Sequence, residues 1–113
     1  MNLIMTVAEL AKKTGFTILS GTQSLTSEIK HIYTCDLLSL VMGRAQAGDV
    51  WITVLGNVNT VAVAALADTA CVILAEGTRL DGEALQKATA KDIAVLASEL
   101  PVYESARIVA DYL

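Results

Sequence analysis

The stretch that decides the fold is Val50–Ala75, which reads VWITVLGNVNTVAVAALADTACVILA. It divides into an apolar strand, a loop of glycine and asparagine, an alanine-rich helix and a second apolar strand. These elements are expected at residues 50–55, 56–59, 60–67 and 71–75, with Asn59 or Thr60 capping the helix. Strands that are apolar on both faces are typical of a parallel sheet covered by helices on both sides. The stretch therefore predicts an α/β fold.

The rest of the chain continues this alternation of strands and helices. Thr6 and Glu9 form a capping box that begins a helix, and Gly15 ends it. Asp36 is expected to cap the next helix. Further strands are expected at 16–19, 28–35 and 93–97, and further helices at 37–42, 81–90 and 101–113. The pattern predicts an α/β fold made of a single compact domain over residues 1–113, with a mainly parallel open sheet and helices on both faces.

The composition restricts the possible partners. Of the 113 residues, 54% are hydrophobic, and the mean hydropathy is +0.55. This apolar surplus in a short chain predicts buried helices together with a subunit interface, and a homodimer is the simplest symmetric outcome. The formal net charge of −4 and the aromatic content of 4% argue against binding to nucleic acid or to an anionic membrane.

Several chemistries lack the residues that they need. Cys35 and Cys71 are expected to be buried, reduced thiols, and His31 is the sole histidine, so we expect neither a metal site nor a cofactor. No pairing of a nucleophile with a base is evident, so we expect no enzyme. Residues 1–5 lack the pattern of a signal peptide. The apolar run 58–75 is interrupted by an aspartate and reads as two short elements, so we expect a cytoplasmic protein.

Polar residues follow the strands that we expect in the sheet, in the segments 34–36, 55–59, 75–79 and 98–101. In open α/β sheets, ligands bind beyond the carboxyl ends of the strands. A glycine there permits a tight turn, and the free N–H groups of the following helix attract anions, so the loop at 56–60 is a candidate phosphate site. The candidate ligand-binding residues are Asp36, Gly56, Asn57, Asn59, Thr60, Glu76 and Gly77, with Arg79 beside them.

Each candidate also has an ordinary structural interpretation. The loop at 56–59 could be a plain strand-to-helix turn with an asparagine cap, and Asp36 could be a helix cap only. Glu76 and Arg79 could clamp a substrate or form a solvated pair. No GxGxxG or GxxxxGK[ST] motif occurs, so the residues alone leave these alternatives open.

Four segments carry a resemblance to a known family: YTCDLLSLVM at 33–42, GDVWIT at 48–53, NTVAVAAL at 59–66 and VILAEG at 72–77. In order and spacing they resemble the DRTGG domain family, and single-domain bacterial members in particular. Such domains also occur beside CBS domains and in long phosphotransacetylases, and they are similar to the N-terminal domain of HPr kinase/phosphorylase. No literal Asp-Arg-Thr-Gly-Gly occurs here, and the corresponding region is Gly56–Asn59.

The resemblance implies a regulatory or ligand-sensing α/β domain that often self-associates, without kinase activity. It also implies a bacterial setting near hydrogenase or redox-regulatory proteins, one of which would be the protein partner. We therefore expect a non-enzymatic domain that binds a nucleotide or another phosphorylated metabolite at the loop Gly56–Thr60. The alternative is a structural protein–protein interaction module that acts through homodimerisation and partner docking, without a small ligand.

Overall fold

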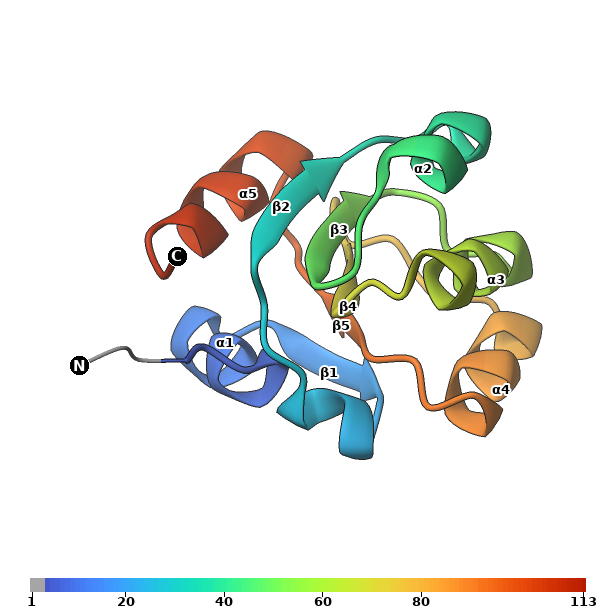
Figure 1. Ribbon diagram of the computed structural model, residues 1–113, viewed down its shortest axis with the longest axis horizontal. Helices are drawn as coiled ribbons and strands as arrows, with labels where there is room; N and C mark the ends of the chain where they lie inside the picture. The colour runs from blue at the N-terminus through green and yellow to red at the C-terminus, as the bar shows by residue number, and fades with distance from the viewer. Residues whose placement is uncertain (1–3) are drawn as a thin grey trace.

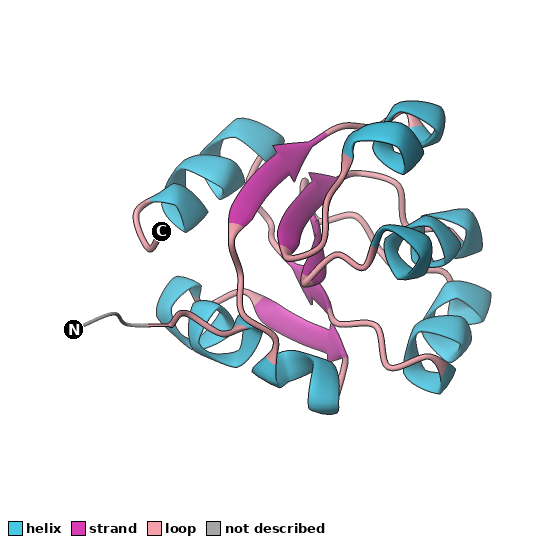
Figure 2. Ribbon diagram, viewed as in Figure 1, coloured by secondary structure: helices cyan, strands magenta, loops and turns pink. Residues whose placement is uncertain are grey.

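A five-stranded sheet in the order β1-β5-β4-β3-β2 lies between two layers of helices in the computed structural model, which describes residues 4–113 (Figure 2). The strands are β1 (Thr17–Ser20), β2 (His31–Thr34), β3 (Asp49–Thr53), β4 (Cys71–Leu74) and β5 (Val95–Ala97). The helices are α1 (Val7–Thr14), α2 (Leu38–Arg44), α3 (Val58–Ala67), α4 (Gly82–Ala90) and α5 (Val102–Ala110), with a 3-10 turn, η1, at Gln23–Thr26. The expectation about a signal peptide rests largely on residues 1–3, which lie outside the described residues.

The sheet is mainly parallel, as the sequence predicts. Strands β2, β3, β4 and β5 run in parallel and follow one another in chain order across the sheet. Among the strands of residues 4–113, only β1 is antiparallel, and it pairs with β5 at the far edge. The prediction of an α/β fold with a mainly parallel open sheet is confirmed.

Helices cover both faces of the sheet, which confirms the second part of that prediction. Figure 1 shows α1 and α5 on one face and α2, α3 and α4 on the other. Side chains alternate along each central strand, so that Ile52 and Ile73 join the core under α1 and α5, while Trp51 and Val72 join the core under the other three helices. Strands buried on both faces in this way explain the unbroken apolar runs of the sequence.

The predicted ends of α1 are confirmed. The Thr6 hydroxyl accepts a hydrogen bond from the Glu9 N–H, the Glu9 carboxylate accepts one from the Thr6 N–H, and Gly15 takes a left-handed conformation with φ of 78°. At the last helix, expected over 101–113, Pro101 occupies the N-cap position rather than the first position within the helix. Its missing N–H is harmless at either position, because the first amides of a helix have no partner within the helix.

Two other predicted caps are wrong. Asp36 does not cap α2, whose N-cap is Leu37 without a side-chain bond. Asn57, rather than Asn59 or Thr60, caps α3, because its side-chain oxygen is the one that reaches the amides of the first turn. The Asp36 carboxylate instead accepts hydrogen bonds at the end of the neighbouring strand β3, so it joins two strand ends rather than beginning a helix.

The strand expected at 28–35 is shorter than the alternation suggests. The strand that pairs with β3 covers only His31–Thr34, with single flanking bonds from the N–H groups of Lys30 and Cys35. The residues before it turn towards the N-terminal segment, where the Ile29 N–H donates to the Met5 carbonyl and Glu28 pairs with Thr6. The apolar side chain of Ile29 is therefore buried under α1 rather than in the sheet.

The two cysteines differ in their surroundings. Cys71 is fully buried in β4, and this burial raises the pKa of its thiol to about 12. Cys35 is only half-buried, so the expectation of two buried thiols is correct for Cys71 alone. Trp51 packs in the core as expected, and its indole N–H donates to the Cys35 carbonyl at 2.9 Å.

A polar cluster fixes η1 at the opposite end of the sheet from the strand-end loops. The Asp92 carboxylate accepts hydrogen bonds from the backbone N–H groups and the hydroxyls of Thr22 and Ser24. These bonds, chiefly that from the Thr22 N–H, lower the pKa of Asp92, although partial desolvation acts in the opposite direction. The negative charge of Asp92 thus supports this turn.

Neither a membrane-spanning helix nor a cluster of metal ligands occurs in the part of the chain that the structure describes. Among residues 4–113, every helix is too short or too polar to cross a membrane. In the same part of the chain, no three His, Cys, Asp or Glu side chains gather closely enough to hold a metal ion.

Candidate functional site

The loops after the four parallel strands lie along one edge of the sheet, because the carboxyl ends of parallel strands point the same way. These loops are residues 35–37 after β2, 54–57 after β3, 75–81 after β4 and 98–101 after β5. The sequence therefore predicts correctly which segments share this edge. The order of the strands then decides which of the loops are neighbours.

The loops after β4 and β5 separate to opposite faces of the sheet. The first leads into α4 on one face, and the second leads into α5 on the other (Figure 1). Such a divergence is the topological switch point at which open α/β sheets form a crevice beyond the strand ends. We therefore expect a crevice at the carboxyl ends of β4 and β5, close to the edge of the sheet where β1 pairs with β5.

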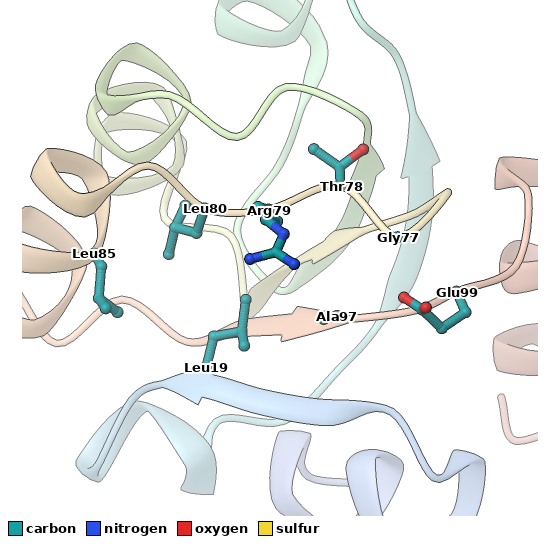
Figure 3. A pocket seen from close by; sticks show the side chains of 8 residues that line it. All are labelled: Leu19, Gly77, Thr78, Arg79, Leu80, Leu85, Ala97 and Glu99. Carbon is teal, nitrogen blue, oxygen red and sulfur yellow. The ribbon is translucent and has the colours of Figure 1, made fainter.

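A pocket of about 410 Å³ lies at this point. Its lining comes from β1, the loop after β4, α4, and the end of β5, and consists of Leu19, Gly77, Thr78, Arg79, Leu80, Leu85, Ala97 and Glu99. Figure 3 shows the three leucine side chains together at one end and Glu99 at the other, with the Arg79 guanidinium between them. The pocket thus has an apolar end and a charged end, and its volume falls within the range of small-molecule sites.

Backbone hydrogen bonds hold the loop after β4 against the loop after β5. The Glu76 N–H donates to the Leu100 carbonyl at 2.8 Å, and the Gly77 N–H donates to the Ser98 carbonyl at 2.9 Å. Both Glu76 and Gly77 are left-handed, with φ of 62° and 67°. A left-handed conformation is uncommon for a residue with a side chain, and such residues cluster at ligand-binding sites.

Glycine at position 77 leaves room for the Glu99 carboxylate. A Cβ at this position would come within 3.0 Å of the Glu99 Oε2. Among the described residues, neither Arg79 nor Glu99 has an ion-pair partner. Both side chains are therefore available to a ligand in the pocket.

Gly56 forms part of the support behind the pocket. A Cβ on Gly56 would overlap the carbonyl oxygen of Arg79, so only glycine permits the two loops to approach this closely. The Gly56 carbonyl also accepts a hydrogen bond from the Asp81 N–H at 2.9 Å. The loop after β3 thus fixes the backbone that carries the Arg79 side chain.

The amides expected to bind an anion at the start of α3 already have a partner. The Asn57 side-chain oxygen accepts from the N–H groups of Asn59 at 2.9 Å and Thr60 at 3.2 Å. The side chain of Asn59 is exposed, whereas Thr60 is buried and its hydroxyl has no hydrogen-bond partner among residues 4–113. This geometry corresponds to the plain strand-to-helix turn that the sequence left open as the alternative.

Asp36 lies at the other end of the strand-end edge. Its carboxylate accepts from the Thr53 hydroxyl at 2.6 Å and from the Val54 N–H at 3.0 Å. Three strand spacings separate β2 from β5, or about 14 Å. Asp36 therefore connects the ends of β2 and β3 and does not line the pocket.

Of the seven candidate residues, the pocket lining includes only Gly77. Glu76 precedes Gly77 in the same loop without lining the pocket, and Gly56 lies behind it. The other four, Asp36, Asn57, Asn59 and Thr60, belong to the edge near β2 and β3. Arg79 was named beside the candidates, and the lining residues that the sequence did not single out are Leu19, Thr78, Leu80, Leu85, Ala97 and Glu99. Glu99 follows an expected strand and so had a signal, whereas Leu19 is brought here only by the pairing of β1 with β5, which no local pattern reveals.

Comparisons with known proteins agree with this fold. The family model described as the DRTGG domain matches residues 9–112. A solved structure with the same fold holds the CBS and DRTGG domains of the regulatory region of Clostridium perfringens pyrophosphatase, complexed with activator, diadenosine tetraphosphate. The TM-score is 0.77 and the identity 12%, and the match covers 96% of this chain and 47% of that chain, or about half of its length. No protein of curated function matches the sequence.

Proposed function

The chain belongs to the DRTGG domain family, and from that premise we propose that it is a non-enzymatic regulatory domain that senses a nucleotide or another phosphorylated metabolite. The observation that carries this proposal is the pocket at the switch point between β4 and β5, with its apolar end and its free arginine. Both the position and the composition of the pocket are typical of ligand sites in α/β sheets.

The two ends of the pocket suit the two parts of such a ligand. Leu19, Leu80 and Leu85 offer an apolar surface for a base. Arg79 offers a guanidinium, which binds phosphate through paired, charge-assisted hydrogen bonds. The Glu99 carboxylate can accept from sugar hydroxyls at the charged end. None of these groups forms a nucleophile–base pair, which supports binding without chemistry.

The known structure supports the class of ligand. In the Clostridium perfringens protein, the CBS and DRTGG region was solved with a dinucleoside polyphosphate activator. A regulatory region of related fold that meets a nucleotide is the reason for choosing nucleotides first among phosphorylated ligands. At 12% identity, the binding residues of this chain are argued from its own pocket.

The pocket is connected to the rest of the domain by short backbone contacts. The loop of Arg79 leads directly into α4 and packs against Gly56, which precedes α3. A ligand that draws Arg79 towards its phosphate would therefore act on two of the three helices on one face. We propose that a shift of α3 and α4 is the signal that a partner protein recognises. The family resemblance suggests that this partner is hydrogenase- or redox-associated and that both proteins belong to a bacterial cytoplasm.

The test is calorimetric titration with AMP, ADP, ATP and inorganic phosphate, on the wild type and on Arg79→Ala. We expect a nucleotide to bind and Arg79→Ala to weaken it about 10- to 100-fold, as for the loss of a hydrogen-bonded charge. Arg107→Ala is the matched control, because Arg107 is an exposed arginine on α5 away from the pocket. It should bind like the wild type.

Two other results would change the proposal. If binding survives in Arg79→Ala but is lost in Asn59→Ala, the ligand sits at the loop Gly56–Thr60 and not in the pocket. If no member of the panel binds the wild type, ligand sensing of this class is refuted. The second candidate function, an interaction module that acts through homodimerisation and docking, then takes its place.

That second function has its own supporting observation. Several large apolar side chains are exposed on α2 and α3, including Leu66 at 75% and Met42 at 58%. Helix α3 is apolar almost all round, and such helices are usually covered. A homodimer that covers part of this surface is compatible with ligand sensing as well as an alternative to it.

A further inference from the structure

The strand β2 has a free edge. It pairs with β3 on one side, and no strand of residues 4–113 lies on the other. The Cys35 N–H donates to the Ile52 carbonyl on β3. Because the direction of the backbone groups alternates along a strand, the N–H and C=O groups of His31 and Tyr33 also point to β3. The N–H and C=O groups of Ile32 and Thr34 therefore point outwards, where a further strand would pair with them.

The two edges of the sheet differ in how well they are protected. The register of β1 is interrupted between Ile18 and Ser20, which is a bulge of the kind that blunts an edge. The register of β2 is regular from His31 to Thr34, and the strand contains no proline. Of the two edge strands, β2 is therefore the one whose free backbone groups can pair with a further strand.

Two helices that carry exposed apolar side chains flank this edge. Figure 1 shows α5 and α2 on either side of β2, at the end of the molecule where the sheet stops. Leu37, Leu40 and Met42 at α2 and Tyr103 on α5 are between 42% and 70% exposed. A partner at the β2 edge would lie beside these two helices.

We propose that the partner is a second copy of this chain, and that the two β2 strands pair antiparallel about a two-fold axis at Tyr33. In this register Ile32 of each copy faces Thr34 of the other, and each such pair exchanges both of its backbone hydrogen bonds. The two Tyr33 side chains then form an aromatic cross-strand pair at the axis. One continuous sheet runs through both copies.

Charge supports this register. Lys30 and Asp36 are exposed residues at the two ends of β2. The two-fold axis places Lys30 of one copy at the end that holds Asp36 of the second copy, and the same occurs again by symmetry. A parallel arrangement would instead place like charges together, which is unfavourable.

This inference names a surface for the self-association proposed above, and it does not depend on ligand binding in the pocket. The variant Thr34→Pro tests it, because proline removes the outward N–H and is tolerated on edge strands. Thr34→Ala is the matched control, because it removes the same exposed side chain and keeps the outward N–H. Sedimentation velocity over a concentration series measures the dissociation constant of each.

The wild type should sediment at twice 11.9 kDa at high concentration. Thr34→Pro should raise the dissociation constant about 30-fold, equivalent to about 2 kcal/mol, because the bond is lost twice by symmetry. Thr34→Ala should dimerise like the wild type. A wild type that stays monomeric throughout, or a dimer equally stable in Thr34→Pro, would overturn the proposal.

Hydrogen exchange of the wild type gives a measurement that needs no variant. The amides of Ile32 and Thr34 should exchange slowly in the dimer and quickly once dilution produces monomer, because only the second copy protects them. The amide of Tyr33, which points to β3, should be protected in both states. Equal rates for Ile32 and Thr34 in the two states would show that a dimer uses another surface.

Discussion

Replacing Gly56 by alanine tests whether the loop after β3 supports the pocket. The new methyl group would overlap the Arg79 carbonyl oxygen and lie within 3.1 Å of its carbonyl carbon and 3.3 Å of the Thr78 Cγ2. Two of these three atoms belong to backbone, which cannot rotate away as a side chain can. The loop that carries Arg79 must therefore move as a whole.

The expected loss of stability has two parts. Overpacking of a well-packed site costs about 1–3 kcal/mol. The hydrogen bond from the Asp81 N–H to the Gly56 carbonyl is also strained or lost, which costs about 0.5–1.5 kcal/mol. The free energy of unfolding should therefore fall by about 2–4 kcal/mol. For a domain of this size, the melting temperature should fall by about 4 °C for each kcal/mol.

Urea denaturation followed by circular dichroism measures this change, and Gly43→Ala is the control. Gly43 lies in α2, and a Cβ there would meet nothing within 4 Å. The control should gain about 0.5–1 kcal/mol, because alanine favours a helix more than glycine does. If Gly56→Ala unfolds within about 0.5 kcal/mol of the wild type, the loop yields freely. Gly56 would then not be the residue that fixes the backbone of Arg79.

Three further predictions concern single side chains. Asn57→Ala should destabilise the protein by about 1 kcal/mol in urea denaturation through loss of the α3 cap, whereas Asn59→Ala, at an exposed position, should be neutral; equal effects would contradict the assignment of the cap. Asp36→Ala and Thr53→Val should each lower the free energy of unfolding by about 1–2 kcal/mol, and the double variant by about 1 kcal/mol less than the sum, because both remove one bond; additive losses would show that the bond contributes little. The pKa of Asp92 is lowered in the folded state, so its contribution to stability is present above the unfolded pKa of about 4 and is lost as the pH falls through the folded value. The urea midpoint of Asp92→Asn should hence fall less than that of the wild type between neutral and acid pH, and parallel pH profiles would oppose this.

Local patterns in the sequence predict much of the fold. The unbroken apolar runs at 50–55 and 71–75 identify the central parallel strands, because only strands covered on both faces can be apolar throughout. The capping box at Thr6 and the glycine at position 15 locate α1, since both depend on residues close together in the chain. These features follow from the sequence because their causes are local.

The site is less predictable because it depends on the order of the strands. Loops at the strand ends can be found from the sequence, but their neighbours cannot. The pocket forms at β4 and β5 because the loops after these strands lead to opposite faces of the sheet. It also needs β1, which pairs with β5. The sequence reasoning chose the loop at 56–60 for its glycine, whereas that glycine serves a close contact between backbones.

The choice between caps shows the same limit on a smaller scale. Asp36, Asn57 and Asn59 are all residue types that cap helices. Which one does so depends on small differences in backbone direction after each strand. Asp36 is drawn to Thr53 because parallel pairing places the two strand ends side by side.

The pairing of β1 with β5 also has a consequence for the order in which the chain folds. Thr17 near the beginning pairs with Ala97 near the end, so this contact closes a very long loop. During synthesis, β1 cannot pair until β5 has left the ribosome, whereas β2, β3 and β4 can pair with one another as they emerge. The pocket is completed by this last step, because Leu19 and Ala97 both line it. A nascent or C-terminally truncated chain would thus have no pocket, and only a finished copy could respond to a ligand there.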